Sequence, residues 1–161
     1  MTECVVVAGG NIGDVKQSIE KASRLIEQRI GQIVGVSAWL ESEAWGFVSD
    51  PFTNRALLVR TEMTAHNVLK ELLQIEETLG RNREKEAIYK RETLQKYAAR
   101  IIDLDIILFG DECIQSKTLE IPHPRATERD FVLKTVAEVL KLSEKEVVKK
   151  IQGIRNGKEI I

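Results

Sequence analysis

The chain has 161 residues, of which 43% are hydrophobic and 30% are charged, and its formal net charge at pH 7 is −1. This length and composition predict a globular protein with one domain over residues 1–161 and a single core. The balanced charge argues against a general binder of nucleic acids or membrane surfaces, because such proteins usually carry a clear positive excess.

The cysteines and the apolar runs bear on the compartment in which the protein works. Cys4 and Cys113 are far apart and form no Cys-x-x-Cys pair, which argues against a disulfide framework or a zinc site. No apolar run reaches the length of a signal peptide or a membrane span. We therefore expect a cytoplasmic protein that binds neither nucleic acid nor membrane.

The first half of the chain predicts a strand, a helix and two more strands. Residues 4–8 are apolar and rich in valine, as in a buried strand. A glycine-rich turn follows, and it matches neither a P-loop nor a dinucleotide-binding fingerprint. Asp14 is then expected to cap a helix that ends at Gly31. Residues 33–40 and 53–61 are typical of the next two strands.

The second half adds a helix, a strand and C-terminal helices. Thr64 can cap a second helix, and the apolar residues 101–109 predict a fourth strand. The resulting order, β-α-β-β-α-β, is typical of the ferredoxin-like α+β sandwich, an antiparallel sheet with helices packed on one face. A third helix is expected over residues 128–140, and Ser143 with Glu146 forms a capping box for a short last helix.

The sharpest chemical signal is a pair of aspartates in the fourth strand. Residues two apart on a strand share a face, so Asp103 and Asp105 are expected to lie side by side. The opposite face, expected to enter the core, carries Ile102, Leu104, Ile106 and Leu108. Adjacent carboxylates repel each other, and a divalent cation relieves that repulsion. The pattern therefore favours a Mg²⁺ site over two acids on a solvated sheet face.

A basic segment precedes these aspartates. Between residues 81 and 100 there are seven Lys or Arg against three Glu. Arginine binds phosphate oxygens bidentately, so Arg81 at a helix end and Arg100 near the aspartates are candidates to hold a metal-bound triphosphate. The other basic residues of this segment are expected to belong to a solvated loop.

A histidine between two prolines is a weaker signal. Pro122 and Pro124 restrict the backbone around His123, whose imidazole can donate a hydrogen bond to a phosphate oxygen. A lone histidine is more often structural, so a functional role for His123 is supported only together with the other signals.

Aromatic residues gather in the loop between the second and third strands. Only 5% of the chain is aromatic, yet Trp45, Phe47 and Phe52 all fall here. Such residues can stack on a flat heterocycle while Asn54 bonds its edge, although core packing explains each aromatic residue equally well.

Taken together, these residues resemble the 6-hydroxymethyl-7,8-dihydropterin pyrophosphokinase family. The landmarks stand in family order over residues 4–140, and the stretch 100–110 is the most specific of them. The matching segments are Gly10–Asp14, Phe52–Asn54, Leu79–Arg81, Arg100–Gly110 and Pro122–Pro124, followed by Arg129 and Phe131.

The resemblance implies a reaction and the residues that perform it. The reaction is transfer of pyrophosphate from ATP to the pterin hydroxyl with AMP as leaving group, and two Mg²⁺ ions would bridge Asp103, Asp105 and the ATP phosphates. The residues implied to be catalytic are Arg81, Arg100, Asp103 and Asp105. Those implied to contact ATP are Arg81, Tyr97, Arg100, His123 and Arg129. Those implied to contact the pterin are Ser42, Trp45, Phe52, Asn54, Asp103 and Phe131.

The chain departs from the family pattern in four places. The loop between Arg83 and Lys96 is several residues longer than in the family, and Glu43–Ala44 stands where prolines are frequent. Tyr97 replaces a common tryptophan, and Pro124 replaces an aromatic residue of some relatives. These departures bear on substrate affinity and loop kinetics rather than on the reaction type.

Two alternatives stay open at this point. One is a ferredoxin-like module that binds a nucleotide or RNA without catalysis, which would not need the aspartate pair. The other is a Mg²⁺-dependent phosphotransferase whose acceptor is not a pterin. We expect the chain to act as a monomer on small molecules.

Overall fold

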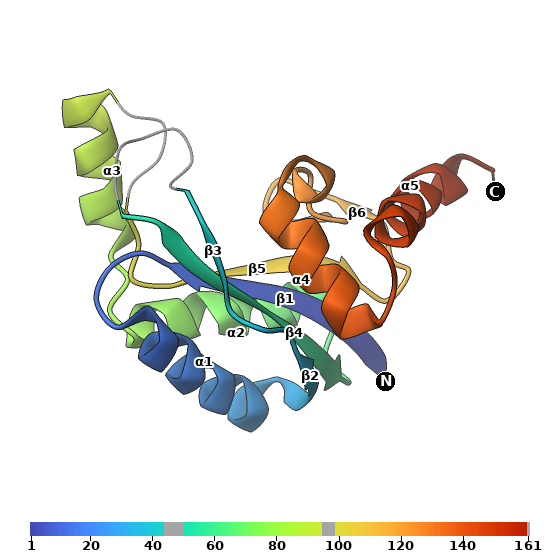
Figure 1. Ribbon diagram of the computed structural model, residues 1–161, viewed down its shortest axis with the longest axis horizontal. Coiled ribbons are helices and arrows are strands. Elements are labelled where there is room, and N and C mark those ends of the chain that lie inside the picture. Colours follow the sequence, from blue (N-terminus) through green and yellow to red (C-terminus); the bar gives the residue numbers. More distant parts are fainter. Residues whose placement is uncertain (44–49, 95–98, 161) are drawn as a thin grey trace.

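The protein is described by a computed structural model that covers residues 1–43, 50–94 and 99–160 (Figure 1). The main sheet has the strand order β2-β4-β1-β5, with β3 paired to β4, and every pairing in it is antiparallel. Its strands are β1 (Thr2–Gly10), β2 (Gly31–Val36), β3 (Leu40–Ser42), β4 (Phe52–Thr61) and β5 (Asp103–Phe109). The helices are α1 (Val15–Arg29), α2 (Ala65–Thr78), α3 (Arg83–Thr93), α4 (Asp130–Leu140) and α5 (Glu144–Ile160).

The prediction of a ferredoxin-like α+β fold is confirmed. The elements β1-α1-β2-β4-α2-β5 follow the expected β-α-β-β-α-β order, and β1 lies between β4 and β5, the two strands of the second half. In Figure 1, α1 and α2 cover one face of the sheet, while α4 and α5 lie against the other. None of the described helices is long and apolar enough to cross a membrane.

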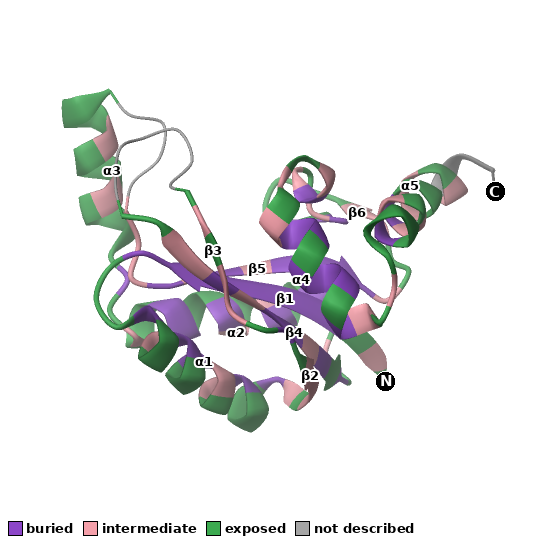
Figure 2. Cartoon of the chain, viewed as in Figure 1, coloured by how far each residue is buried: buried purple, intermediate pink, exposed green. Residues whose placement is uncertain are grey.

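Two buried clusters, one on each face, hold these layers together (Figure 2). Under α1 and α2 the cluster contains Val6, Ile19, Leu57 and Leu72. Under α4 and α5 it contains Val5, Ala56, Val136 and Ile151. The strands alternate between the clusters because successive side chains point to opposite faces. A sheet that is packed on both faces can hold side chains at the ends of its strands in fixed positions.

A β-bulge in β5 corrects one prediction about the aspartate strand. Val5 pairs with Leu108 whereas Val6 pairs with Ile106, so Ile107 is an extra residue on β5. Ile107 and Leu108 therefore both join the cluster under α4 and α5. The expectation that Leu108 shares a face with Leu104 and Ile106 was wrong, because the alternation restarts at the bulge.

Helix α3 corrects a second prediction. The basic segment was expected to be a loop, but Arg83–Thr93 is helical, and Asn82 caps it by accepting a hydrogen bond from Lys85 N at 3.0 Å. No residue of α3 is buried, so the sequence contains no apolar stripe to reveal it. Figure 1 shows α3 projecting from one end of the molecule.

The predicted starts of three helices agree with the structure, whereas several other limits of helices and strands differ from the prediction. The predicted caps Asp14, Thr64 and Ser143 are confirmed by side-chain hydrogen bonds to the backbone N–H three residues on. The last helix, α5, is not short but 17 residues long. The strand expected over residues 33–40 divides into β2 and β3, and a small hairpin of β6 (Ile114–Gln115) and β7 (Glu120–Ile121) was not predicted.

Candidate functional site

The floor of the site is a row of three residues on neighbouring strands. Gly9 of β1 pairs with Asn54 of β4 on one side and with Asp103 of β5 on the other. Residues directly opposite each other share a sheet face, here the one toward α4. A Cβ atom at Gly9 would stand 2.6 Å from Asn54 Oδ1, so glycine leaves room for the asparagine amide. The next row, Val7 with Ala56 and Asp105, continues this floor.

Strand β3 fixes the amide of Asn54. The Nδ2 group donates to Ser42 Oγ at 2.8 Å and to Leu40 O at 3.1 Å. The side chain is buried, so these bonds hold it in one orientation. Ser42 and Phe52 are paired across β3 and β4, which brings three of the predicted pterin residues together.

Three carboxylates surround Arg81, which follows α2. Its Nη1 donates to Glu76 Oε2 at 3.1 Å and to Asp103 Oδ1 at 3.0 Å. Its Nε and Nη2 donate to the two oxygens of Glu86 on α3, at 3.0 and 3.1 Å. The carboxylates raise the pKa of the guanidinium although burial opposes them. We call Glu76, Arg81, Glu86 and Asp103 the Arg81 cluster.

Glu76 is the buried anchor of the Arg81 cluster. It belongs to α2, and its Oε2 also accepts a hydrogen bond from Leu104 N at 2.7 Å, which ties α2 to β5. Its Oε1 accepts from Arg83 Nη2 at 2.7 Å. Burial raises the pKa of the Glu76 carboxyl, although Arg81 and Arg83 favour its ionised form.

Arg100 holds the second oxygen of Asp103. Its Nη1 donates to Asp103 Oδ2 at 3.0 Å, while its Nε is buried without a hydrogen-bond partner among the described residues. Asn11 fixes its backbone, because Asn11 Oδ1 accepts from Arg100 N at 2.8 Å and Asn11 N donates to Arg100 O at 2.9 Å. The glycine-rich turn thus positions an arginine whose Nε–H can still bind an anion.

The two aspartates have opposite electrostatic surroundings. Burial raises the pKa of Asp103, but Arg100 and Arg81 outweigh it and hold that pKa below its usual range. Burial and the charge of Asp103 raise the pKa of Asp105 well above its usual range, although Arg100 and Arg129 oppose them. The charged form of Asp105 therefore lacks sufficient compensation within the protein.

This donor set fits a divalent cation that brings its own further ligands. Along the described parts of the chain, no group of three or more acidic, histidine or cysteine side chains is arranged to hold a metal ion by itself. Mg²⁺ usually takes one or two carboxylates and completes its shell with water and substrate phosphates. Asp103 and Asp105 supply that number of carboxylates, and a cation would provide the charge that Asp105 lacks.

The predicted histidine is neutral at neutral pH. Burial and the nearby Arg129 lower the pKa of His123 to about 4. Its Nδ1 accepts a hydrogen bond from Arg125 N at 3.2 Å, so the proton of the neutral ring is on Nε2. Arg155 of α5 donates to His123 O at 3.0 Å, which explains one use of the long last helix. His123 is therefore oriented as an N–H donor.

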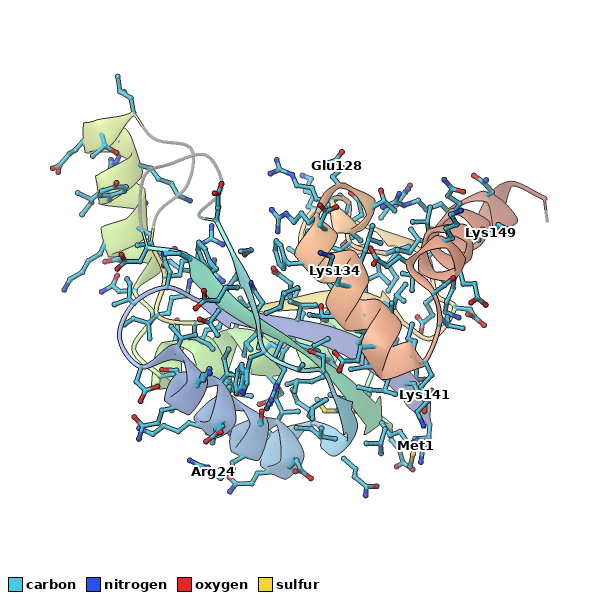
Figure 3. All side chains as sticks on the ribbon, viewed as in Figure 1. Met1, Arg24, Glu128, Lys134, Lys141 and Lys149 are labelled. Atoms are coloured by element: carbon cyan, nitrogen blue, oxygen red, sulfur yellow. The ribbon has the colours of Figure 1, made fainter. Side chains whose placement is uncertain are left out.

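Arg129 and Phe131 lie at the N-terminal end of helix α4. Arg129 favours the ionised form of Asp105, and Phe131 packs against the cluster under α4. Figure 3 labels Glu128 near the start of α4 and Lys141 at its end, beside Met1. A cavity of about 460 Å³ at that far end is lined by Met1, Val5, Leu108, Leu140 and Lys150 among others, and by no predicted site residue.

The structure joins most of the predicted residues and adds others. Arg81 and Arg100 are each in direct contact with Asp103, and Asp105, His123 and Arg129 are electrostatically linked to this group. Trp45 and Tyr97 lie outside the described residues. The sequence reasoning missed the roles of Glu76, Glu86 and Asn11. A signal existed only for Glu76, a charged residue four positions after Leu72 on the buried side of α2.

The comparison with protein families decides the classification. The sequence model of the family described as 7,8-dihydro-6-hydroxymethylpterin-pyrophosphokinase (HPPK) matches residues 5–141. The chain belongs to the HPPK family. The matched region includes the floor residues, the Arg81 cluster, Arg100, the aspartate pair, His123 and α4, and it ends before α5.

Individual relatives agree with the HPPK assignment. The 2-amino-4-hydroxy-6-hydroxymethyldihydropteridine pyrophosphokinase of Porphyromonas gingivalis is 33% identical over 133 residues, which are 81% of this chain and 86% of the relative. The protein of the same name from Bacillus subtilis is 34% identical over 143 residues, covering 88% of this chain and 80% of the relative.

Solved HPPK-DHPS structures share the fold. The wild-type Plasmodium falciparum HPPK-DHPS with pteroate superposes on 99% of this chain with a TM-score of 0.67 at 14% identity. An HPPK-DHPS in complex with substrates gives a TM-score of 0.68 at 13% identity. The chain spans 46% and 45% of those longer chains, so the likeness concerns the fold of one part of them.

Proposed function

We propose that this HPPK chain transfers the pyrophosphoryl group of ATP to the hydroxyl of 6-hydroxymethyl-7,8-dihydropterin and releases AMP, as a step of folate biosynthesis. The observation that carries the proposal is the pair Asp103 and Asp105 on one sheet face, with Arg81, Arg100 and Arg129 around it. Membership of the family supports the choice of ATP and pterin as substrates. A module that only binds a nucleotide would not require two adjacent, partly buried acids, an arrangement that costs free energy.

We further propose that Asp103 and Asp105 hold two Mg²⁺ ions. Bound there, the ions would neutralise phosphate charge and lower the pKa of a coordinated hydroxyl. Asp105, whose charge is undercompensated in the free protein, would become ionised on binding. Arg81 and Arg100 each donate to one oxygen of Asp103, so an ion bound there would share these oxygens with the two arginines.

The arginines around the aspartate pair are placed to hold the triphosphate. Arg100 offers the buried Nε–H that has no partner among the described residues, and its guanidinium fork matches phosphate oxygens. Arg129 stands beside Asp105 at the start of α4. His123 would donate its Nε2–H to a phosphate oxygen, and being neutral it can do so without adding charge.

The pterin would lie over Gly9, between Phe52 and Phe131. The absence of a side chain at Gly9 lets a flat ring approach the sheet between Asn54 and Asp103. Asn54 uses its Nδ2 group on β3, so its Oδ1 would accept a hydrogen bond from the pterin edge. The substrate hydroxyl would then be positioned for in-line attack on the β-phosphorus, and catalysis would consist mostly of positioning and charge neutralisation.

We also propose that the chain is one domain that works as a monomer in the cytoplasm. Helices pack against both faces of the sheet, which supports the monomer (Figure 2). The two cysteines are far apart in the sequence and form no motif, which is consistent with a reducing compartment.

The test is the identity of the nucleotide product. The protein is incubated with ATP, Mg²⁺ and 6-hydroxymethyl-7,8-dihydropterin, and AMP and ADP are separated and quantified. We expect AMP in an amount equal to the pterin consumed, and none when either pterin or Mg²⁺ is omitted. ADP in place of AMP would indicate a simple kinase. No nucleotide product from folded protein would favour a binding module.

A further inference from the structure

Arg81 is already occupied by carboxylates before any ligand arrives. An arginine has five N–H donors, and four of those on Arg81 are used by Glu76, Glu86 and Asp103 within the described residues. A phosphate that binds Arg81 through two hydrogen bonds, in a bidentate arrangement, must therefore displace one of these three carboxylates.

The three carboxylates differ in how firmly they are held. Glu76 lies on the packed helix α2, its side chain is 3% exposed, and it accepts two further hydrogen bonds from Leu104 N and Arg83. Asp103 is the first residue of β5 and is paired in the sheet with Gly9 of β1. Glu86 is the exception, because it is carried by α3, which buries no residue of its own.

The geometry of Glu86 resembles that of a bound phosphate. Its two oxygens face Nε and Nη2 of Arg81 in a parallel pair of bonds, at 3.0 and 3.1 Å, which is the arrangement an arginine uses for phosphate. Its side chain is 13% exposed, compared with 4% for Arg81, so it approaches the arginine from the open side. Besides Glu86, α3 is tied to the body through the ion pair of its first residue, Arg83, whose side chain is 55% exposed.

We propose that Glu86 is an internal competitor of ATP, which occupies the phosphate-binding edge of Arg81 and is displaced by the nucleotide. Glu86 thereby sets the affinity for ATP and couples nucleotide binding to release of α3, while Glu76 keeps hold of Nη1 throughout. This inference rests on the proposed function, since it takes ATP as the ligand of Arg81.

The test compares two variants that each remove one negative charge from α3. Glu86→Gln keeps the shape of the side chain but loses the ionic pair with Arg81. Glu92→Gln is the matched control, because Glu92 is an exposed residue of the same helix. The dissociation constant of α,β-methylene-ATP with saturating Mg²⁺ is measured calorimetrically for both variants and the wild type, together with that of the pterin.

We expect Glu86→Gln to bind α,β-methylene-ATP about tenfold more tightly than the wild type, a change of about 1.4 kcal/mol. Glu92→Gln should change the constant less than about twofold, since an exposed charge is screened by solvent. The pterin constant should stay the same in all three proteins. A merely structural role of Glu86 predicts the opposite sign, namely a lower melting temperature with unchanged or weaker nucleotide binding.

Each other outcome overturns the proposal. Equal or weaker binding by Glu86→Gln would show that Glu86 does not compete with the nucleotide, and Glu86→Ala serves as a second variant should the glutamine itself pair with Arg81. If both variants bind the ATP analogue more tightly by the same factor, the effect comes from the lost negative charge on α3 in general and not from the position of Glu86. If the wild type binds no nucleotide analogue at all, it is the proposed function that fails.

Discussion

Helices α2 and α3 hold the same arginine from two sides, yet they are attached to the molecule in different ways. α2 buries Val68, Leu72 and Ile75 in the core in addition to Glu76. α3 buries none of its residues and projects from the sheet, as the exposed colouring in Figure 2 shows. The carboxylate of α2 is thus backed by hydrophobic packing, whereas that of α3 is backed mainly by ion pairs.

This difference separates a structural ion pair from an exchangeable one. Freeing Glu76 would require α2 to leave the core and would leave Leu104 N and Arg81 without their acceptor. Freeing Glu86 requires only that an exposed helix move, and the ion pairs it loses can be replaced by phosphate. Two glutamates that bind the same arginine therefore differ in role: Glu76 is a structural partner and Glu86 an exchangeable one. The substitutions below test this difference and the site around it.

The largest loss of activity is expected at the aspartate pair, which belongs to β5 and not to α2 or α3. Asp105→Ala should lower turnover at least about a thousandfold, about 4 kcal/mol, because metal ions contribute several kcal/mol to such transfers. The fold should survive, since the charge of Asp105 is unfavourable in the free protein. AMP formation and urea unfolding measured on the same sample check both statements. Turnover at the wild-type rate would remove the metal assignment.

Breaking the structural ion pair should cost stability. Glu76→Ala should lower the free energy of unfolding by about 3 kcal/mol or more, because it leaves Arg81 buried with one acceptor fewer. Glu86→Ala should lower it less than Glu76→Ala does, because Glu86 lies on the more exposed side of Arg81, where water can replace it, and α3 buries no residue. Urea titrations of the two variants give the comparison. Equal losses would mean that α2 and α3 are attached to the same degree.

Removing the second arginine of Asp103 should affect chemistry more than binding of the pterin. Arg100→Ala is expected to slow the single-turnover rate about a hundredfold, which is the scale for losing one donor to a transferring group. The dissociation constant of the pterin should change less than about twofold, since Arg100 pairs with Asp103, which lies across Gly9 from Asn54. An unchanged single-turnover rate would contradict this role.

The smallest effect is expected from the pH response of His123. Its folded pKa of about 4 is below the unfolded value of 6.5, so only the unfolded chain takes up a proton between these values. The contribution of His123 to stability is therefore complete above pH 6.5 and is lost as the pH falls toward 4. Unfolding of His123→Gln should show a flatter pH dependence there. An NMR titration of the imidazole that gives a midpoint near 6.5 in the folded protein would contradict it.

Much of this arrangement could be predicted from local sequence patterns. The period of two in β5 placed Asp103 and Asp105 on one face, and the order of apolar segments gave the ferredoxin-like topology. The bulge at Ile107 could not be predicted, because it depends on how β5 pairs with β1. Helix α3 was missed because a helix without a buried face has no apolar period.

The Arg81 cluster depends on contacts that no local pattern contains. Glu76 and Glu86 are five residues from Arg81 on either side in sequence, and only the turn after α2 brings both to the same guanidinium. The roles of Trp45 and Tyr97 in substrate binding stay predictions, as both lie outside the described residues.

The most direct test of the exchange at Arg81 observes its Nε–H group by NMR, with the signal assigned through Arg81→Lys. In the free protein this group donates to Glu86, so the signals of the wild type and of Glu86→Gln should differ. With Mg²⁺ and α,β-methylene-ATP bound, we expect the two signals to coincide, because a phosphate has replaced Glu86 in both proteins. Signals that remain as far apart with the nucleotide bound as without it would show that Glu86 never leaves Arg81, and would contradict the account.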